Sequence, residues 1–205
     1  RAIDLSANTT GVTIQQSLNA IDADAQADEQ AEDDYDADNA AVYTAINGDI
    51  LTGSGNDLLD VASGRIYGDS YLGAGNDRVV LSGDSGYVGD LHFGSGTAAM
   101  AMSGSSSFLG DLDVAGNAAS LTLADTAAFT GTITGGANLG VTVNGGKFGA
   151  SEAATLSFDS LTVNSGGALN VYIDGSEGTA SLVDVNTATF ATGSKVSATI
   201  SSLGN

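Results

Sequence analysis

The 205-residue chain contains no cysteine, no proline and no tryptophan. Without cysteine, neither a disulfide framework nor a thiolate metal site can form. The absence of proline beside 29 glycines argues against collagen and against proline-rich linkers, and it leaves the backbone N–H groups available for strand ladders. Aromatic residues make up only 6% of the chain, so we expect a thin core of Val, Leu, Ile and Ala.

Positive charge is also scarce. Five Lys and Arg stand against 25 Asp and Glu, which gives a formal net charge of −20. A surface this negative repels phosphate backbones, anionic lipids and acidic polysaccharides, so we expect no nucleic-acid partner. It attracts cations instead, above all calcium in an extracellular setting.

Long apolar runs are missing too. No stretch approaches the roughly 18 consecutive apolar residues of a transmembrane helix. The sequence starts at Arg1 without the apolar segment of a signal peptide. We therefore expect a processed or excised piece of a longer protein.

A short apolar-x-apolar unit recurs every 20 or 21 residues. Its copies are residues 59–61, 79–81, 100–102, 121–123 and 141–143. A second unit keeps the same interval, and its glycines are 21 residues apart at Gly68, Gly89, Gly110 and Gly131. Clusters of Gly, Ser, Asn and Asp between the units indicate turns.

Alternation of period 2 within each unit predicts a strand with one inward and one outward face. The predicted inward residues are Leu59, Val61, Val79, Leu81, Met100, Met102, Leu121, Leu123, Val141 and Val143. Tyr87, Phe108, Phe129 and Phe148 are expected to form an aromatic column inside. Equal repeats that stack in parallel predict an all-β fold, a single-stranded parallel β-helix with about 20–21 residues per coil.

The repeat divides the chain into three regions. Residues 48–150 form the regular β-helix, and 151–205 form less regular coils that continue it. Residues 1–47 form an N-terminal part with an acidic excursion at 21–40, where nine carboxylates lie between Asp22 and Asp38. This excursion is either a solvated helix or a disordered loop.

Four segments carry a resemblance to a known family. They are residues 73–83 (GAGNDRVVLSG), 89–96 (GDLHFGSG), 161–169 (LTVNSGGAL) and 188–196 (ATFATGSKV). Across about 48–203 the chain resembles the passenger region of alphaproteobacterial autotransporters (type V secretion). The resemblance implies a right-handed β-helix that is exported and displayed or released at the cell surface. It implies contact with the outer membrane only through a barrel that this chain lacks.

Two Gly/Asn/Asp turns, at 53–59 and 73–79, resemble the calcium repeats of repeats-in-toxin proteins. That resemblance implies one calcium ion bridged by Asn56, Asp57, Asn76 and Asp77. The equivalent turn at 94–98 has lost its acid, and the spacing of 20 exceeds that of a nonapeptide repeat. The alternative is that these are β-turns in which Asn and Asp are favoured for backbone reasons. Calcium is the only cofactor that we consider.

The residues do not predict an enzyme. Gly83-Asp84-Ser85-Gly86 imitates the loop around a serine nucleophile, but the only histidine, His92, is expected to point outward opposite Asp113. The aligned Asp69, Asp90 and Asp111 lack the aromatic platforms of a sugar-active enzyme, which leaves polysaccharide-active catalysis as a lesser alternative. We assign no catalytic residue.

These observations favour a structural role outside the cell. We expect an extracellular or outer-membrane-surface rod that displays or self-assembles into a filament or layer, because the ends of a β-helix expose unpaired strand edges. Its partners would be further copies, bound end to end or laterally. The alternative is an adhesin, a binding module that contacts cells or glycans.

Overall fold

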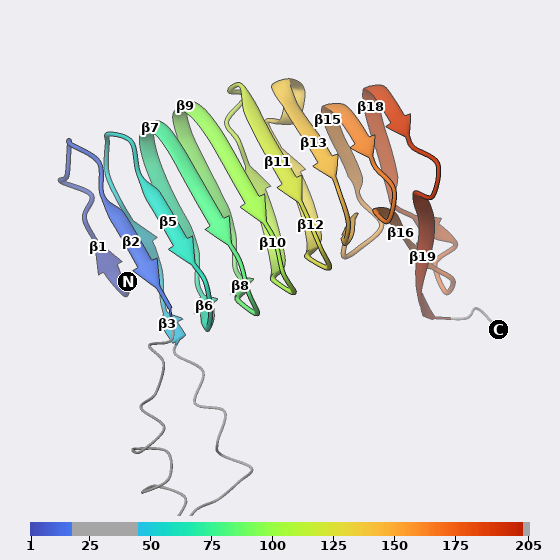
Figure 1. Ribbon diagram of the computed structural model, residues 1–205, viewed down its shortest axis with the longest axis horizontal. Helices are drawn as coiled ribbons and strands as arrows, with labels where there is room; N and C mark the ends of the chain where they lie inside the picture. Colours follow the sequence, from blue (N-terminus) through green and yellow to red (C-terminus); the bar gives the residue numbers. More distant parts are fainter. Residues whose placement is uncertain (18–44, 203–205) are drawn as a thin grey trace, which may run out of the picture.

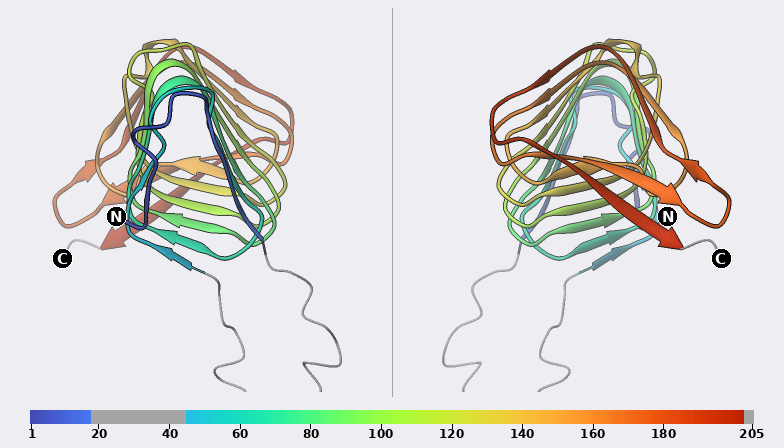
Figure 2. Two further views of the ribbon diagram at one scale, coloured as in Figure 1. Left: turned by 90° about the vertical axis from the view of Figure 1, so that its left-hand side faces the viewer. Right: turned by 90° about the vertical axis from the view of Figure 1, so that its right-hand side faces the viewer.

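The computed structural model describes residues 1–17 and 45–202. In these residues the backbone is mostly β-strand, and successive coils stack into a solenoid with the first and last coils at opposite ends (Figure 1). Seen along the stack, each coil traces a rounded triangle, so the solenoid has three faces (Figure 2). The predicted all-β fold of stacked parallel coils is confirmed.

Parallel pairing between equivalent strands builds each face. The first face contains β2 (Thr13–Gln16), β5 (Leu58–Val61), β7 (Ser70–Leu81), β9 (Leu91–Met102), β11 (Ala119–Leu123), β13 (Leu139–Val143), β15 (Thr155–Val163) and β18 (Leu182–Phe190). The second contains β3 (Ala45–Asn47), β6 (Arg65–Tyr67), β8 (Gly86–Val88), β10 (Ser107–Asp113), β12 (Ala128–Thr134), β14 (Lys147–Gly149), β16 (Ala168–Asp174) and β19 (Lys195–Ser202).

The third face is made largely by strands that continue around a corner. It contains β1 (Ile3–Asp4), β4 (Ile50–Leu51), the first parts of β7 and β9 and the last parts of β10 and β12. Two short elements complete the described chain, the 3-10 helix η2 (Gly136–Asn138) and the strand β17 (Thr179–Ala180). The described residues hold no helix of the length and hydropathy that a membrane span requires.

The register reproduces the sequence repeat. On the third face Ile50 pairs with Ser70, Ser70 with Leu91 and Leu91 with Leu112, at separations of 20, 21 and 21 residues. The first coil is longer, since Ile3 pairs with Ile50 across 47 residues. The excess over 20 residues equals the length of segment 18–44, which contains the predicted acidic excursion and lies outside the described residues.

The last coil is lengthened as well, to 27 residues between Ala168 and Lys195. Its additional residues include a hairpin in which β17 pairs antiparallel with the end of β16. The hairpin therefore accounts for the loss of the regular repeat after about residue 150.

Inside the solenoid, equivalent side chains stack in columns. Tyr87, Phe108, Phe129 and Phe148 are each at most 1% exposed, and successive ring centroids are 5.1, 5.0 and 5.4 Å apart. All ten predicted inward aliphatic residues of the first face are buried as well. Parallel, in-register stacking places each core residue on its equivalent in the next coil, so one coil buries little apolar surface by itself.

Candidate functional site

The four predicted calcium residues lie on two stacked segments, one directly before β5 and one inside β7, so residues 73–79 form part of a strand and not the predicted turn. Within each pair the side chains lie on opposite sides of the backbone. Asn56 and Asn76 are exposed, whereas Asp57 and Asp77 are only 2% and 3% exposed. On the outside, Asn56 Oδ1 accepts a hydrogen bond from the Asn76 N–H at 2.8 Å. Asn76 Oδ1 in turn accepts from the N–H and the hydroxyl of Thr97. The asparagines thus bond the backbone of the next coil and form a ladder between coils.

The two aspartates form a second ladder inside. Asp57 Oδ1 accepts a hydrogen bond from the Val12 N–H at 2.7 Å, and Asp77 Oδ1 accepts one from the Asp57 N–H at 2.9 Å. Burial is the main cause that raises the pKa of Asp77; the Asp57 N–H opposes it and the Asp57 charge adds to it. No group of three or more Asp, Glu or His side chains converges anywhere in the described residues. The calcium site stays a prediction.

A third ladder runs along the corner between the second and third faces. Asp69 Oδ1 accepts a hydrogen bond from the Asp90 N–H, and Asp90 Oδ1 accepts one from the Asp111 N–H, both at 2.8 Å. Asp49 begins the ladder with a longer bond, 3.3 Å, from the Asp69 N–H. Hydrogen bonds from backbone N–H groups stabilise a carboxylate and so offset part of the repulsion between stacked charges. The aligned aspartates therefore join adjacent coils.

The segment from Gly83 to Gly86, which imitates the loop around a serine-protease nucleophile, is a turn, as predicted. Ser85 is 0% exposed, and the register places it in one internal column with Ser106. His92 lies on the outside of the third face, opposite Asp113, as its alternation with buried neighbours predicts. Its ring stacks on that of Tyr71, with centroids 4.7 Å apart, and its Nδ1 is 3.6 Å from Asp113 Oδ2. A substrate outside the solenoid could not reach the buried serine.

The outer side of the second face carries a column of exposed apolar side chains. Tyr67, Val88 and Leu109 occupy equivalent positions in three successive coils and are 47%, 40% and 47% exposed. The column continues through Thr130 to Gly149.

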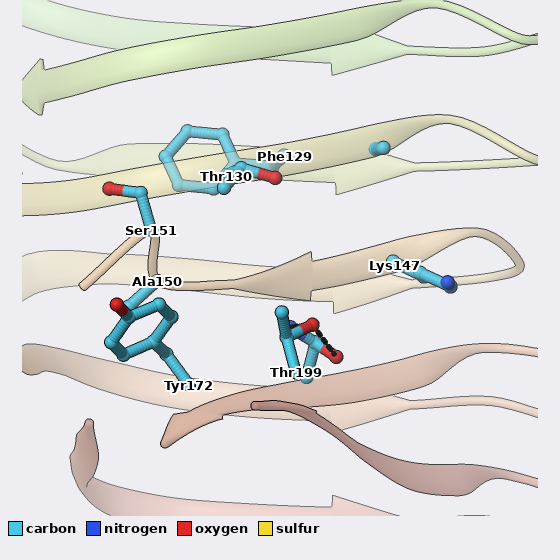
Figure 3. Close-up of a pocket in the computed structure, with 9 residues that line it drawn as sticks. Phe129, Thr130, Lys147, Ala150, Ser151, Tyr172 and Thr199 are labelled. Atoms are coloured by element: carbon cyan, nitrogen blue, oxygen red, sulfur yellow. Dashed lines mark hydrogen bonds between the residues drawn. The ribbon is translucent and has the colours of Figure 1, made fainter. Parts of the chain in front are cut away.

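Beside Thr130 the surface is hollowed to a volume of about 320 Å³. Figure 3 shows Tyr172 and Ser151 on one side of this hollow and Lys147 on the other.

The second exceptional surface is the end of the last coil. Phe190 continues the column of the buried Val163, and Val196 continues that of Leu169. Yet Phe190 is 45% exposed, Val196 is 65% exposed and Ile200 is 54% exposed. In the described residues β18 and β19 pair only with strands of the preceding coil. We call this surface, made by Phe190, Val196 and Ile200, the C-terminal face.

Comparison with family models, with curated proteins and with solved structures finds no match.

Sequence reasoning anticipated unpaired strand edges at the ends but missed the hollow. In this column Gly149 follows Val88, Leu109 and Thr130. A glycine within a strand marks a close approach of another backbone, here that of Asn170, so it gave no signal for the hollow.

Proposed function

We propose that this chain is an exported structural protein, a rod displayed at the bacterial surface that assembles by end-to-end stacking of its coils. The observation that carries the proposal is the C-terminal face. Phe190 and Val196 continue core columns and Ile200 continues the partly buried column of Ile173, but part of their apolar surface is exposed to water. Burying that surface under another coil is favourable at roughly 25 cal/mol for each Å².

The first coil offers a matching surface at the other end. Ile3, Ile14 and Ile46 place one isoleucine on each of the three faces, and all three are only partly buried against the core. A second copy stacked with its first coil on the C-terminal face would continue the columns and provide hydrogen-bond partners for the unpaired strand edges. The contact is head to tail, and such contacts produce filaments when rotation does not close them.

Composition supports the extracellular part of the proposal. A chain without cysteine needs no control of disulfide pairing during export. Its net charge of −20 favours solubility of the rod and disfavours lateral association between identical surfaces. End-to-end contact through an apolar face is then the preferred mode of self-association.

Sedimentation velocity over a range of protein concentrations tests this assembly. The parent chain should form species whose size grows with concentration, and Val196→Lys should remain monomeric because a charge then lies in the stacking surface. Thr142→Lys is the matched control, since it adds the same charge to a partly exposed outward position in the middle of the rod.

If both variants form assemblies of the same size as the parent chain, the contact lies elsewhere. A parent chain that stays monomeric would refute self-assembly. Circular dichroism of both variants checks that the fold is kept.

A second candidate function, a binding module that contacts glycans, is favoured by the outer side of the second face. Three exposed apolar residues in register and an adjoining hollow form one continuous strip on that side. Exposed apolar strips with polar margins are typical of interaction sites. The exposed column of Tyr67, Val88 and Leu109 lies on earlier coils, whereas the hollow reaches Thr199, next to Ile200 of the C-terminal face.

A further inference from the structure

The hollow on the second face spans three coils, and its lining includes Thr130, Lys147 and Asn170. Along β14, Lys147 is exposed, whereas Phe148 and Gly149 are buried. A Cβ atom on Gly149 would lie 2.2 Å from the Asn170 carbonyl oxygen, so the close approach of β16 requires glycine here. The hollow therefore opens beside Gly149, among the side chains of the flanking strands that carry Thr130 and Asn170.

One wall of the hollow is held by a side-chain network. The Asn170 amide nitrogen donates to Thr199 Oγ1 at 3.0 Å, and its oxygen accepts from the Ser197 hydroxyl at 2.9 Å. These bonds fix the orientation of the Asn170 amide. A primary amide has two N–H groups, and the bond to Thr199 uses only one of them. The Thr130 hydroxyl has no hydrogen-bond partner among the described residues, so it too is available to a ligand.

The opposite margins supply a cation and an aromatic ring. Lys147 is exposed. The ion pairs among the described residues are Arg1–Asp4 and His92–Asp113, so Lys147 forms none with them. Its column contains the small residues Ala128 and Ala168, which leave room for the side chain. Tyr172 lies across the hollow and presents its ring at the edge (Figure 3).

Lys195, the second lysine of the chain, extends the same outward column as Lys147, two strands further along. Adjacent strands are about 4.8 Å apart, so the two lysine positions are separated by about 10 Å. Charges more than about 8 Å away are largely screened at physiological ionic strength, so distant carboxylates contribute little at the hollow. Lys147 is the lysine that lines it.

We infer that this hollow binds a single hexuronate unit, a sugar ring that carries a carboxylate. The volume of about 320 Å³ is at the lower end for small-molecule sites and suits one ring better than an oligomer. Tyr172 would contact the apolar C–H face of the ring, and Thr130 and Asn170 would bond its hydroxyls. Lys147 would pair with the carboxylate. The inference deepens the binding-module candidate and is independent of rod assembly.

Titration of the full chain with methyl α-galacturonide, monitored by NMR, tests the site. Methyl α-galactoside is the matched probe, because it has the same ring without the carboxylate. We expect saturable binding of the uronide with a dissociation constant of order millimolar, and binding of the galactoside at least roughly tenfold weaker. Binding of the uronide should weaken as salt increases.

Three variants locate the contact. Lys147→Gln should weaken uronide binding about tenfold and leave galactoside binding unchanged, while Tyr172→Ala should weaken both. Arg78→Gln is the control, since it removes one exposed positive charge from the first face. If Arg78→Gln weakens uronide binding as much as Lys147→Gln does, the effect comes from the net charge of the chain and the proposed role of Lys147 is wrong.

Equal affinity for both probes would overturn the hexuronate assignment while leaving a neutral-glycan module standing. No saturable binding of either probe would overturn the site itself. A parallel titration in a Phe190→Lys background, which places the charge of the stacking surface on the first face and away from the hollow, separates these outcomes from any failure of assembly.

Discussion

Substituting Gly110 by alanine should be among the most damaging single-methyl changes in this solenoid. Gly110 lies at the corner between the second and third faces with φ of +154°, and a Cβ atom there would be 1.8 Å from the Gly89 carbonyl oxygen. That atom belongs to the backbone of the preceding coil. No side-chain rotation relieves the contact, so the two coils must separate by about 1 Å or more at this corner.

The cost follows from what that separation disturbs. The backbone conformation itself costs about 1–3 kcal/mol for a residue with a side chain. The Gly89 N–H donates to the Leu109 carbonyl at 3.0 Å, and the Asp111 N–H donates to Asp90 at 2.8 Å. Weakening both bonds adds roughly 2–3 kcal/mol. We therefore expect Gly110→Ala to lose roughly 3–6 kcal/mol of unfolding free energy, a large part of the stability of a typical domain.

Gly116 is the matched control because it also has a positive φ, +76°, but a Cβ atom there meets nothing within 4 Å. Gly116→Ala should cost only the conformational term, about 1–2 kcal/mol. Urea unfolding of both variants and the parent, followed by far-UV circular dichroism, measures the difference as a shift in midpoint. Equal midpoints for the two variants would refute the argument that close contact between coils, and not the φ angle alone, requires glycine at this corner.

Two further predictions concern the interior. Phe108→Ala should destabilise the fold by about 3–5 kcal/mol, because it leaves a cavity between two stacked rings. Phe190→Ala on the C-terminal face should cost less than about 1 kcal/mol in dilute solution, because Phe190 is already half exposed. Thermal unfolding measures both losses, and similar losses would contradict the burial argument. Asp77→Asn should raise stability at pH 7. The pKa of Asp77 is higher in the folded chain than in the unfolded chain, so ionisation of its carboxyl group lowers the stability of the fold. The stability that the protonated form contributes is fully present below the unfolded pKa of about 3.9 and is lost as the pH rises through the folded pKa. The gain, measured from urea midpoints, should vanish near pH 3; a loss at pH 7 would contradict it.

Much of the fold could be predicted because neighbouring coils repeat the same pattern. Leu59 and Val79 belong to the same inward column, and their spacing of 20 residues in the sequence becomes direct pairing in the structure. The same holds for Phe108 between Tyr87 and Phe129. In a parallel, in-register stack, equivalent residues are neighbours, so a repeat along the chain reports tertiary contacts directly.

The candidate sites were less predictable because they break the repeat. Asn56 and Asp57 were grouped as ligands of one ion, but consecutive residues in an extended segment point to opposite sides, one outward and one inward. The roles of the aspartates also depended on contacts that composition does not reveal. Only the structure shows that Asp69 and Asp90 accept hydrogen bonds from backbone N–H groups of the next coil.

Strand periodicity, coil length and the membership of the core columns can be inferred from the amino-acid sequence. Each of these depends on residues of one type recurring at one phase. The positions of the exposed apolar surface and of the hollow become visible only in the folded chain. Thr130, Lys147 and Tyr172 line the hollow from three successive coils, and the third of these coils is lengthened by a hairpin. Contacts among non-equivalent residues follow no period, so they emerge only once the coils are stacked.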